Sequence, residues 1–301
     1  MSTAPAPTIT ERTTREDATP RRSRTARRFT IGASMLHLFL GVAAIVWLVP
    51  VIWMFVLATS DNDLLQLDSQ TLLPQGFTLQ NLIGELSNSE LPRWFLNSLI
   101  VTGVTTIGTV VCSAMAGYAF GRLDFRFKEP LFIVTLAGLM VPREAMFIPL
   151  YLMFSSAGQL NTYPAMFLPR IALPLGVFIM TQFFRAVPRE LEEAARIDGA
   201  GHRRIFTRIM LPLARPAIAA LAIFAFVQSW NDYLWPLVVA TQPDYYTLTV
   251  GLAQQQASFE AARSLGDLMS RGVIGSLPLI VVFLLFQRQL VRGISLASGE
   301  K

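Results

Sequence analysis

Charged residues are scarce in this chain. Asp, Glu, Lys and Arg together make up 15% of the 301 residues, whereas hydrophobic residues make up 52%. Soluble globular domains devote about a quarter of their residues to charged side chains. The composition therefore excludes an ordinary soluble domain and predicts that lipid covers much of the apolar surface.

Cysteine and histidine are almost absent. The one cysteine, Cys112, excludes a disulfide within the chain. The two histidines, His37 and His202, lie far apart and have no cysteine or carboxylate cluster at ligand spacing. We therefore predict no metal site. An intramembrane enzyme is disfavoured as well, because no His/Glu metal pair or Ser/His arrangement occurs at a useful spacing.

Lysine is equally rare. The chain contains two lysines, Lys128 and Lys301. A phosphate-binding loop of the G-x-x-x-x-G-K-[ST] kind requires a lysine, and neither of these residues is placed to supply one. The sequence therefore predicts no cofactor in this chain, and any ATPase that drives it must be a separate polypeptide.

Long apolar segments dominate what is present. Most of them reach or exceed the ~20 residues needed to cross about 30 Å of hydrocarbon. The six segments are Ile31–Leu57, Trp94–Phe120, Leu131–Ser155, Tyr163–Phe184, Pro212–Ala240 and Gly272–Phe286. This pattern predicts an all-α, polytopic membrane protein with six transmembrane helices.

The basic residues predict the orientation of these helices. With the N-terminus inside, twenty of the 25 Lys and Arg residues fall in cytoplasmic segments. Arg93, Arg263 and Arg271 fall outside, and Arg143 and Arg170 fall within spans. The asymmetry predicts a multi-pass protein with both termini cytoplasmic. We attribute the formal charge of +5 to this orientation and predict no nucleic-acid partner.

The two ends of the chain differ from the apolar segments. Residues 1–30 are rich in Thr, Pro, Ala and Arg, which predicts a disordered basic cytoplasmic tail. The apolar run that follows is longer than the roughly 7–15 residues of a signal-peptide core, so cleavage is disfavoured. We predict a transmembrane domain over residues 31–293 and a cytoplasmic C-terminal tail over residues 294–301.

A polar island, residues 188–211, separates the fourth and fifth apolar segments. Pro188 suits the first turn of a helix, and Glu190, Glu192 and Glu193 complement the positive end of its dipole. Gly199 can take positive φ where that helix stops. The island therefore predicts a short helix, a break and a second helix, which together form a compact knob on the cytoplasmic face.

The island also carries a spaced motif: E-A-A, three residues, G, nine residues, I-x-L-P. A solvent-exposed ion pair between Arg189 and Glu193 would explain the presence of Glu193, but it does not explain the other residues of the motif or their spacing. The motif resembles the coupling motif of the permease subunits of bacterial ABC importers. Its residues are Glu193, Ala194, Ala195, Gly199, Ile209, Leu211 and Pro212.

The likeness covers residues 31–301 and includes Ser229–Pro236, Ser276–Pro278 and Gln287–Gly293. The chain resembles the permease of carbohydrate-uptake ABC importers, of the type of the shorter permease of maltose and glycerol-phosphate transporters. The resemblance implies the type I ABC importer permease fold in a bacterial cytoplasmic membrane. It also implies partners of three kinds: a second homologous permease, two ATPase domains that bind ATP and Mg, and an extracytoplasmic solute-binding protein.

In that family the helix carrying the motif docks in a cleft of the ATPase. The resemblance implies an ATPase contact for the tail Gly293–Lys301 too, although Leu296–Lys301 departs from the Gly-rich maltose-type ending. It implies a binding-protein contact for the outer segment Thr241–Arg271. The resemblance therefore implies that the residues which dock on the ATPase are Glu193, Ala194, Ala195, Arg196, Asp198 and Gly199.

Several polar residues lie at predicted membrane depth, where such groups mark a pathway or a buried pair. Two interpretations stay open: these residues line a solute pathway, or they form buried pairs between helices. In a buried pair, Arg170 would have Asp232 or Glu144 as its partner. Trp230, Tyr233 and Trp235 are candidates to stack on a sugar or to form an interfacial aromatic belt. The polar candidates are Arg143, Glu144, Arg170, Asn231 and Asp232.

Two alternative functions remain at this point. In the nearer alternative, the same kind of ABC importer carries glycerol phosphate, a glycerophosphodiester, a polyol or an amino sugar. Arg143 and Arg170 would suit a phosphorylated solute. The other is a proton-coupled secondary transporter that works alone, with Glu144 and Asp232 as proton carriers. Dependence on ATP separates the two.

Overall fold

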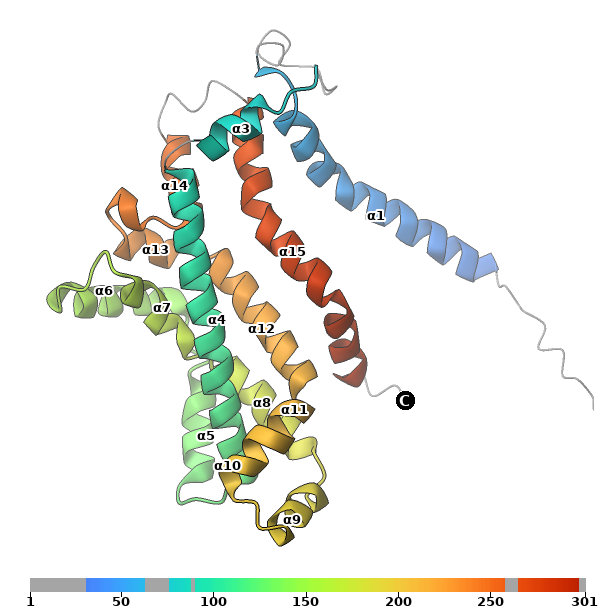
Figure 1. Ribbon diagram of the computed structural model, residues 1–301, viewed down its shortest axis with the longest axis vertical. Helices are drawn as coiled ribbons and strands as arrows, with labels where there is room; N and C mark the ends of the chain where they lie inside the picture. Colours follow the sequence, from blue (N-terminus) through green and yellow to red (C-terminus); the bar gives the residue numbers. More distant parts are fainter. Residues whose placement is uncertain (1–30, 63–75, 88–89, 258–264, 298–301) are drawn as a thin grey trace, which may run out of the picture. The chain divides into compact units, whose positions relative to one another are not determined.

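A computed structural model describes residues 31–62, 76–87, 90–257 and 265–297. These residues divide into two units, Met1–Val49 and Pro50–Lys301. The first helix, α1 (Ile31–Ala58), passes from the first unit into the second. All regular elements of the described residues are helical (Figure 1).

The second unit contains most of the helices. Short 3-10 turns lie at Arg143–Met146 and Pro243–Tyr245, and a π-helical turn lies at Phe206–Met210. The helices are α3 (Gln80–Ser87), α4 (Leu91–Arg122), α5 (Lys128–Ala137), α6 (Phe147–Ser156), α7 (Tyr163–Ile171), α8 (Pro174–Ala186), α9 (Glu190–Ile197), α10 (His202–Ile205), α11 (Leu211–Leu213), α12 (Arg215–Trp230), α13 (Leu234–Val239), α14 (Leu248–Ala257) and α15 (Leu265–Ala297).

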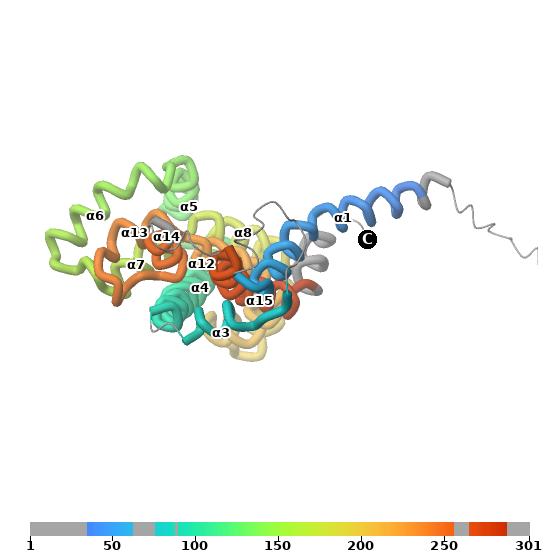
Figure 2. The backbone as a smooth tube through the Cα atoms, turned by 90° about the horizontal axis from the view of Figure 1, so that it is seen from above, coloured from blue at the N-terminus to red at the C-terminus, as the bar shows by residue number. Residues whose placement is uncertain are grey.

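Helix α4 is the central element of this unit. It packs most extensively on α8 and also contacts α7, α12 and α14. Helix α12 in turn packs against both α4 and α15 (Figure 2). Helices α9 and α10 lie with the α4–α5 turn at one end of the unit, called here the α9 end, and α3 and α14 lie at the other, the α3 end (Figure 1).

A stripe of small residues on α4 faces α7 and α8, and its part nearer the end of α4 approaches α8 closely. It recurs every four residues, which places its members on one face of a helix. A Cβ atom added to Gly117 would lie 2.5 Å from Cβ of Met180, so only glycine fits there. Small residues allow such close backbone approach between helices in membranes. The stripe, which the sequence analysis missed, is Thr105, Thr109, Ser113, Gly117 and Gly121.

The structure does not confirm six continuous spans. Three helices in the described residues are long and apolar enough to cross a membrane: Met35–Ala58, Leu91–Arg122 and Leu265–Gln287. Two bent pairs bring the number to as many as five, Tyr163–Ile171 with Pro174–Ala186 at 43° and His202–Leu213 with Arg215–Trp230 at 75°.

The predicted third span, Leu131–Ser155, is wrong as a single helix. It consists of α5 and α6, which have ten residues each. A ten-residue helix is about 15 Å long, half the thickness of the hydrocarbon core. Residues Gly138 and Pro142 lie in the break between them, where proline cannot continue a helix. The predicted fifth span, Pro212–Ala240, is likewise divided, because α12 ends at Trp230.

Candidate functional site

Helix α9 forms the core of the predicted knob. It begins at Glu190, so Pro188 precedes the helix and does not occupy its first turn as predicted. The prediction for Gly199 is confirmed, since its φ is +77°. The Gly199 N–H donates to the carbonyl of Arg196 at 3.0 Å, which closes the helix end in a conformation that favours glycine.

The two faces of α9 have different environments. Glu193 and Ala194 are exposed, and Ile197 is 87% exposed despite its apolar side chain. Within the described part of the chain, Glu193 forms no ion pair, so the alternative pairing with Arg189 is not observed. Ala195, which was predicted to take part in docking, is instead buried on the inner face of the helix. The remaining motif residues Arg196, Asp198 and Gly199 are exposed.

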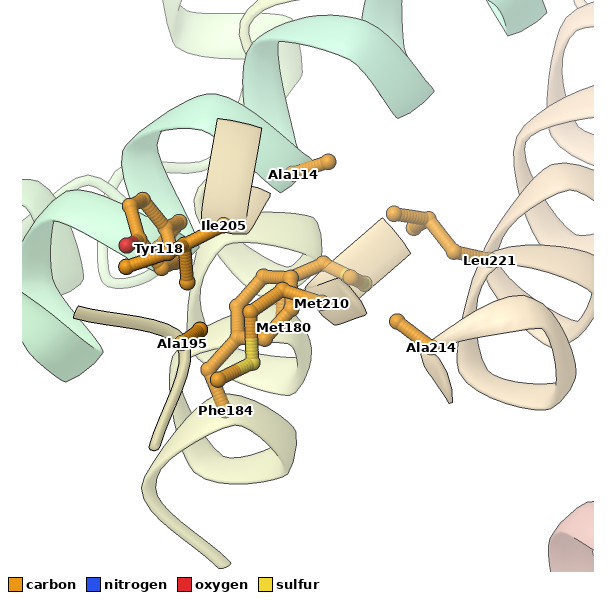
Figure 3. Packing of buried hydrophobic residues seen from close by; sticks show 9 residues of the cluster. All are labelled: Ala114, Tyr118, Met180, Phe184, Ala195, Ile205, Met210, Ala214 and Leu221. Carbon is orange, nitrogen blue, oxygen red and sulfur yellow. The ribbon is translucent and has the colours of Figure 1, made fainter. Parts of the chain in front are cut away.

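Ala195 belongs to an apolar cluster that positions the knob. The cluster joins α4, α8, α9, α10 and the start of α12 (Figure 3). Tyr118 of α4 meets Phe184 of α8 edge to face at a centroid separation of 5.8 Å. Phe184, Ile205 and Met210 are completely buried within this cluster. The exposed face of α9 is therefore carried on a packed base and is not a free loop.

A buried ion pair also ties α9 to α4. Nε of Arg122, the last residue of α4, lies 3.3 Å from Oε1 of Glu192, and the two side chains are 4% and 8% exposed. The Arg122 guanidinium also donates to the carbonyl of Val187, and Arg196 lies 3.8 Å from Oε2 of Glu192. The sequence alone predicted a helix-dipole role for Glu192 and no partner for Arg122, so this ion pair was missed.

Three of the five membrane-depth candidates meet around a cavity of about 450 Å³. Its walls come from α4, α6, α7, α8, α12, α13 and the segment between α5 and α6. Arg143, Arg170 and Asp232 line it, whereas Glu144 and Asn231 do not. Asn231 donates to the Val227 carbonyl of its own helix at 2.9 Å.

Each charged side chain that lines the cavity has a polar partner. Nη2 of Arg170 lies 2.6 Å from Oδ2 of Asp232, with the two side chains 16% and 18% exposed. Of the two partners predicted for Arg170, the structure therefore selects Asp232 over Glu144. Arg143 donates to Oε1 of Gln228 across the same cavity. The polar wall thus consists of an ion pair and a guanidinium with a neutral partner.

The tryptophans of the fifth segment are structural anchors. Trp230 and Trp235 are 3% and 1% exposed. Their indole N–H groups donate to the carbonyls of Gly275 at 3.0 Å and Ala165 at 2.9 Å. Both rings are buried, so the predicted interfacial belt is wrong for these two residues. Trp235 lines the cavity, and its stacking on a solute stays a prediction. Only Tyr233 is exposed.

At the α3 end, the segment 241–250 is held on the start of α4. The Trp94 indole donates to the carbonyl of Pro243 at 3.1 Å, and the Asn97 amide donates to the carbonyls of Asp244 and Tyr246 at 2.9 Å. Oγ of Ser98 accepts the backbone N–H of Leu248 at 2.8 Å. Residues 243–248 of the predicted outer segment are therefore fixed to α4, and residues 258–264 of that segment lie outside the described part.

The described residues hold no group of three or more His, Cys, Asp or Glu side chains that could bind a metal ion. Of the tail predicted to contact the ATPase, Gly293–Lys301, residues 293–297 belong to α15, and residues 298–301 lie outside the described residues.

Comparison with known proteins places the chain in a family. Residues 110–296 match the family described as binding-protein-dependent transport system inner membrane component. The diacetylchitobiose uptake system permease protein of Streptomyces coelicolor is 33% identical over 89% of this chain and 88% of its own length. The arabinooligosaccharides transport system permease protein of Halalkalibacterium halodurans is 36% identical over 75% of this chain and 80% of its own.

The fold is also that of a solved structure. A bacterial ABC transporter involved in the import of the acidic polysaccharide alginate has a chain that matches with a TM-score of 0.76. The match covers 90% of this chain and 99% of that chain at 22% identity. The family match spans the knob and the whole cavity lining from α5 onward. This chain belongs to the family of binding-protein-dependent transport system inner membrane components, the permeases of ABC importers.

Proposed function

We propose that this chain is the permease subunit of an ATP-driven, binding-protein-dependent sugar importer in a bacterial cytoplasmic membrane. It forms half of the translocation pathway beside a second, homologous permease, and a separate ATPase binds ATP and Mg. The observation that carries this proposal is the α9 knob. Glu193 and Ala194 are exposed on a helix whose opposite face is locked to α4 and α8.

In this proposal the α9 end is cytoplasmic. The α4–α5 turn, the start of α5, the end of α8 and α10 lie at this end (Figure 1) and carry Arg126, Lys128, Arg185, Arg203 and Arg204, whereas Arg93 and Arg271 lie on the starts of α4 and α15 at the opposite end. This distribution agrees with the preference of basic residues for the cytoplasmic side. The exposed face of α9 then meets the ATPase, and the segment 241–250 at the α3 end meets the solute-binding protein.

The mechanism follows from that placement. Closure of the ATPase dimer on ATP moves the knobs of the two permeases together and turns the pair from inward- to outward-facing. The loaded binding protein then releases its solute between the permeases, and hydrolysis returns them to the inward-facing state. The C-terminal tail, residues 294–301, is a second candidate contact with the ATPase.

A neutral sugar is the solute that the cavity favours. The charge of Arg170 is matched by Asp232 at 2.6 Å, and Arg143 binds the amide oxygen of Gln228. A phosphate group would need unmatched guanidinium groups to replace its hydration, and only Arg143 is left without an ion pair at this wall in the described residues. The names of two relatives, for diacetylchitobiose and arabinooligosaccharides, agree with a sugar.

The stand-alone transporter is the less favoured alternative. A proton carrier must gain and lose its proton during each cycle, whereas Asp232 is held as the partner of a guanidinium. Glu144, the other proposed carrier, does not line the cavity.

Reconstitution tests the proposal. The chain is co-purified with its partner permease and ATPase, placed in liposomes, and supplied with the solute-binding protein and radiolabelled neutral oligosaccharides or glycerol phosphate. We expect uptake of a neutral sugar only when ATP and every partner are present. Glu193→Ala is expected to abolish uptake in an assembled complex, whereas Glu190→Ala, an exposed acid on the same helix, is expected to preserve it. Solute accumulation by the chain alone under a proton gradient would refute the proposal.

A further inference from the structure

Helix α4 makes specific buried polar contacts at both of its ends. At the α9 end, Arg122 pairs with Glu192, and both side chains are more than nine-tenths buried. At the α3 end, Asn97 is 1% exposed and binds the carbonyls of both Asp244 and Tyr246. One helix therefore holds the knob at one end and the outer segment at the other.

The helix between these contacts is continuous. It has 32 residues, which corresponds to about 48 Å, and its only proline, Pro92, lies in the first turn, where it is tolerated. The neighbouring chain is interrupted between α5 and α6, between α7 and α8, and between α12 and α13. A movement applied to one end of α4 would therefore reach the other end without a hinge in between.

Each end contact is costly to break. Removing one member of a buried ion pair leaves an uncompensated charge, and a buried amide that binds two carbonyls satisfies groups that would otherwise lack partners. The exposed pair between Arg93 and Asp244, with side chains 55% and 61% exposed, contributes much less to the same region. The buried contacts are therefore the ones that can carry a displacement.

We propose that α4 is the connection through which the solute-binding protein controls the ATPase, with Arg122, Glu192 and Asn97 as its positioning residues. This inference rests on the proposed function of α9 and of the outer segment. It assigns Glu192, which the docking motif does not include, the task of making α9 move with α4. Glu193 meets the ATPase, whereas Glu192 faces inward and holds the helix.

The experiment measures ATP hydrolysis by the reconstituted complex with and without loaded binding protein. For Glu192→Gln and for Asn97→Ala we expect the complex to assemble with its ATPase and basal hydrolysis to persist. Stimulation by the binding protein is expected to fall about tenfold, within the usual range of coupling between two sites. Arg122→Lys, which keeps the charge, is expected to retain part of the stimulation. The controls are Arg185→Ala and Arg93→Ala, which break the more exposed pairs with Glu129 and Asp244 at the two ends. Their ATP hydrolysis is expected to be stimulated normally by the binding protein.

The double variant Glu192→Gln with Asn97→Ala decides between one connection and two separate defects. If both residues act through α4, the double variant loses no more stimulation than the worse single variant, because the connection is already broken. Multiplied losses would overturn the inference. So would normal stimulation in both single variants, or loss of the ATPase from their complexes, since that would show a role in assembly alone. Failure of the unmodified complex to respond to binding protein would instead count against the proposed function.

Discussion

Replacement of Gly117 by alanine tests the packing of α4 on α8. The added Cβ would lie 2.5 Å from Cβ of Met180, 2.8 Å from its carbonyl carbon and 2.9 Å from the nitrogen of Thr181. Ordinary carbon contacts are about 3.5–4.0 Å, so the helices would have to separate by about 1 Å. Two of the three obstacles are backbone atoms, which cannot move aside as the end of a side chain can.

The magnitude follows from two opposing effects. Overpacking a well-packed site costs up to about 3 kcal/mol, whereas removing a glycine from a helix interior stabilises by about 1 kcal/mol. We therefore expect Gly117→Ala to destabilise the chain by about 2 kcal/mol, a decrease in Tm of roughly 4–8 °C for a protein of this size class. Gly103 lies on the same helix with no atom within 4 Å of its added Cβ. Gly103→Ala is expected to leave Tm unchanged or to raise it.

The assay is thermal unfolding of the full chain in detergent, followed by the loss of the monodisperse peak on size exclusion. The two substitutions are expected to change Tm in opposite directions. A Gly117→Ala variant as stable as the unmodified chain, or a change of Tm in the same direction for both alanine variants, would refute the proposed close packing of α4 on α8.

Three further predictions concern topology, the cavity and the knob. A reporter fused after Lys128 is expected to read cytoplasmic because of the basic residues at that end, and an external reading would reverse the proposed orientation. Arg170→Leu is expected to reduce the yield of assembled complex, since breaking a buried pair costs about 3–5 kcal/mol, and Arg170→Leu with Asp232→Leu is expected to recover much of it. Normal yield with altered solute preference would instead assign the pair to the pathway. Gly199→Val is expected to stop sugar uptake, because a β-branched residue at positive φ costs about 1–3 kcal/mol and displaces the end of α9. Gly201→Val, at φ −74° with open space around it, is the control, and uptake equal in both variants would contradict this prediction.

Local sequence was sufficient for the features that depend on neighbours along the chain. The apolar segments predicted a helical membrane protein, because their length and composition require lipid around them. The island at residues 188–211 predicted a short helix that ends at Gly199, because caps and turns are set by residues a few positions apart. The spacing of the same island indicated the family that the comparisons then established.

Continuity of the helices was not predictable in the same way. The segment Leu131–Ser155 is as apolar as a membrane span, and composition alone does not distinguish one long helix from two short ones. The segment between α5 and α6 lies against α7, α8 and α12, with which it lines a cavity, and these neighbours are remote from it in sequence or follow it along the chain. The stripe of small residues on α4 had a visible four-residue period, but its partner α8 could not be named from it.

The sequence by itself determined where the charges of this protein lie along the chain, and only the tertiary structure decided which of them meet. It left Arg170 with two possible acids, and the fold selected Asp232. It placed Glu192 and Glu193 side by side, and the fold buried one against Arg122 and exposed the other. The physical reason is that an ion pair depends on distances of a few ångströms between helices that are remote in sequence, and the packing of those helices sets such distances.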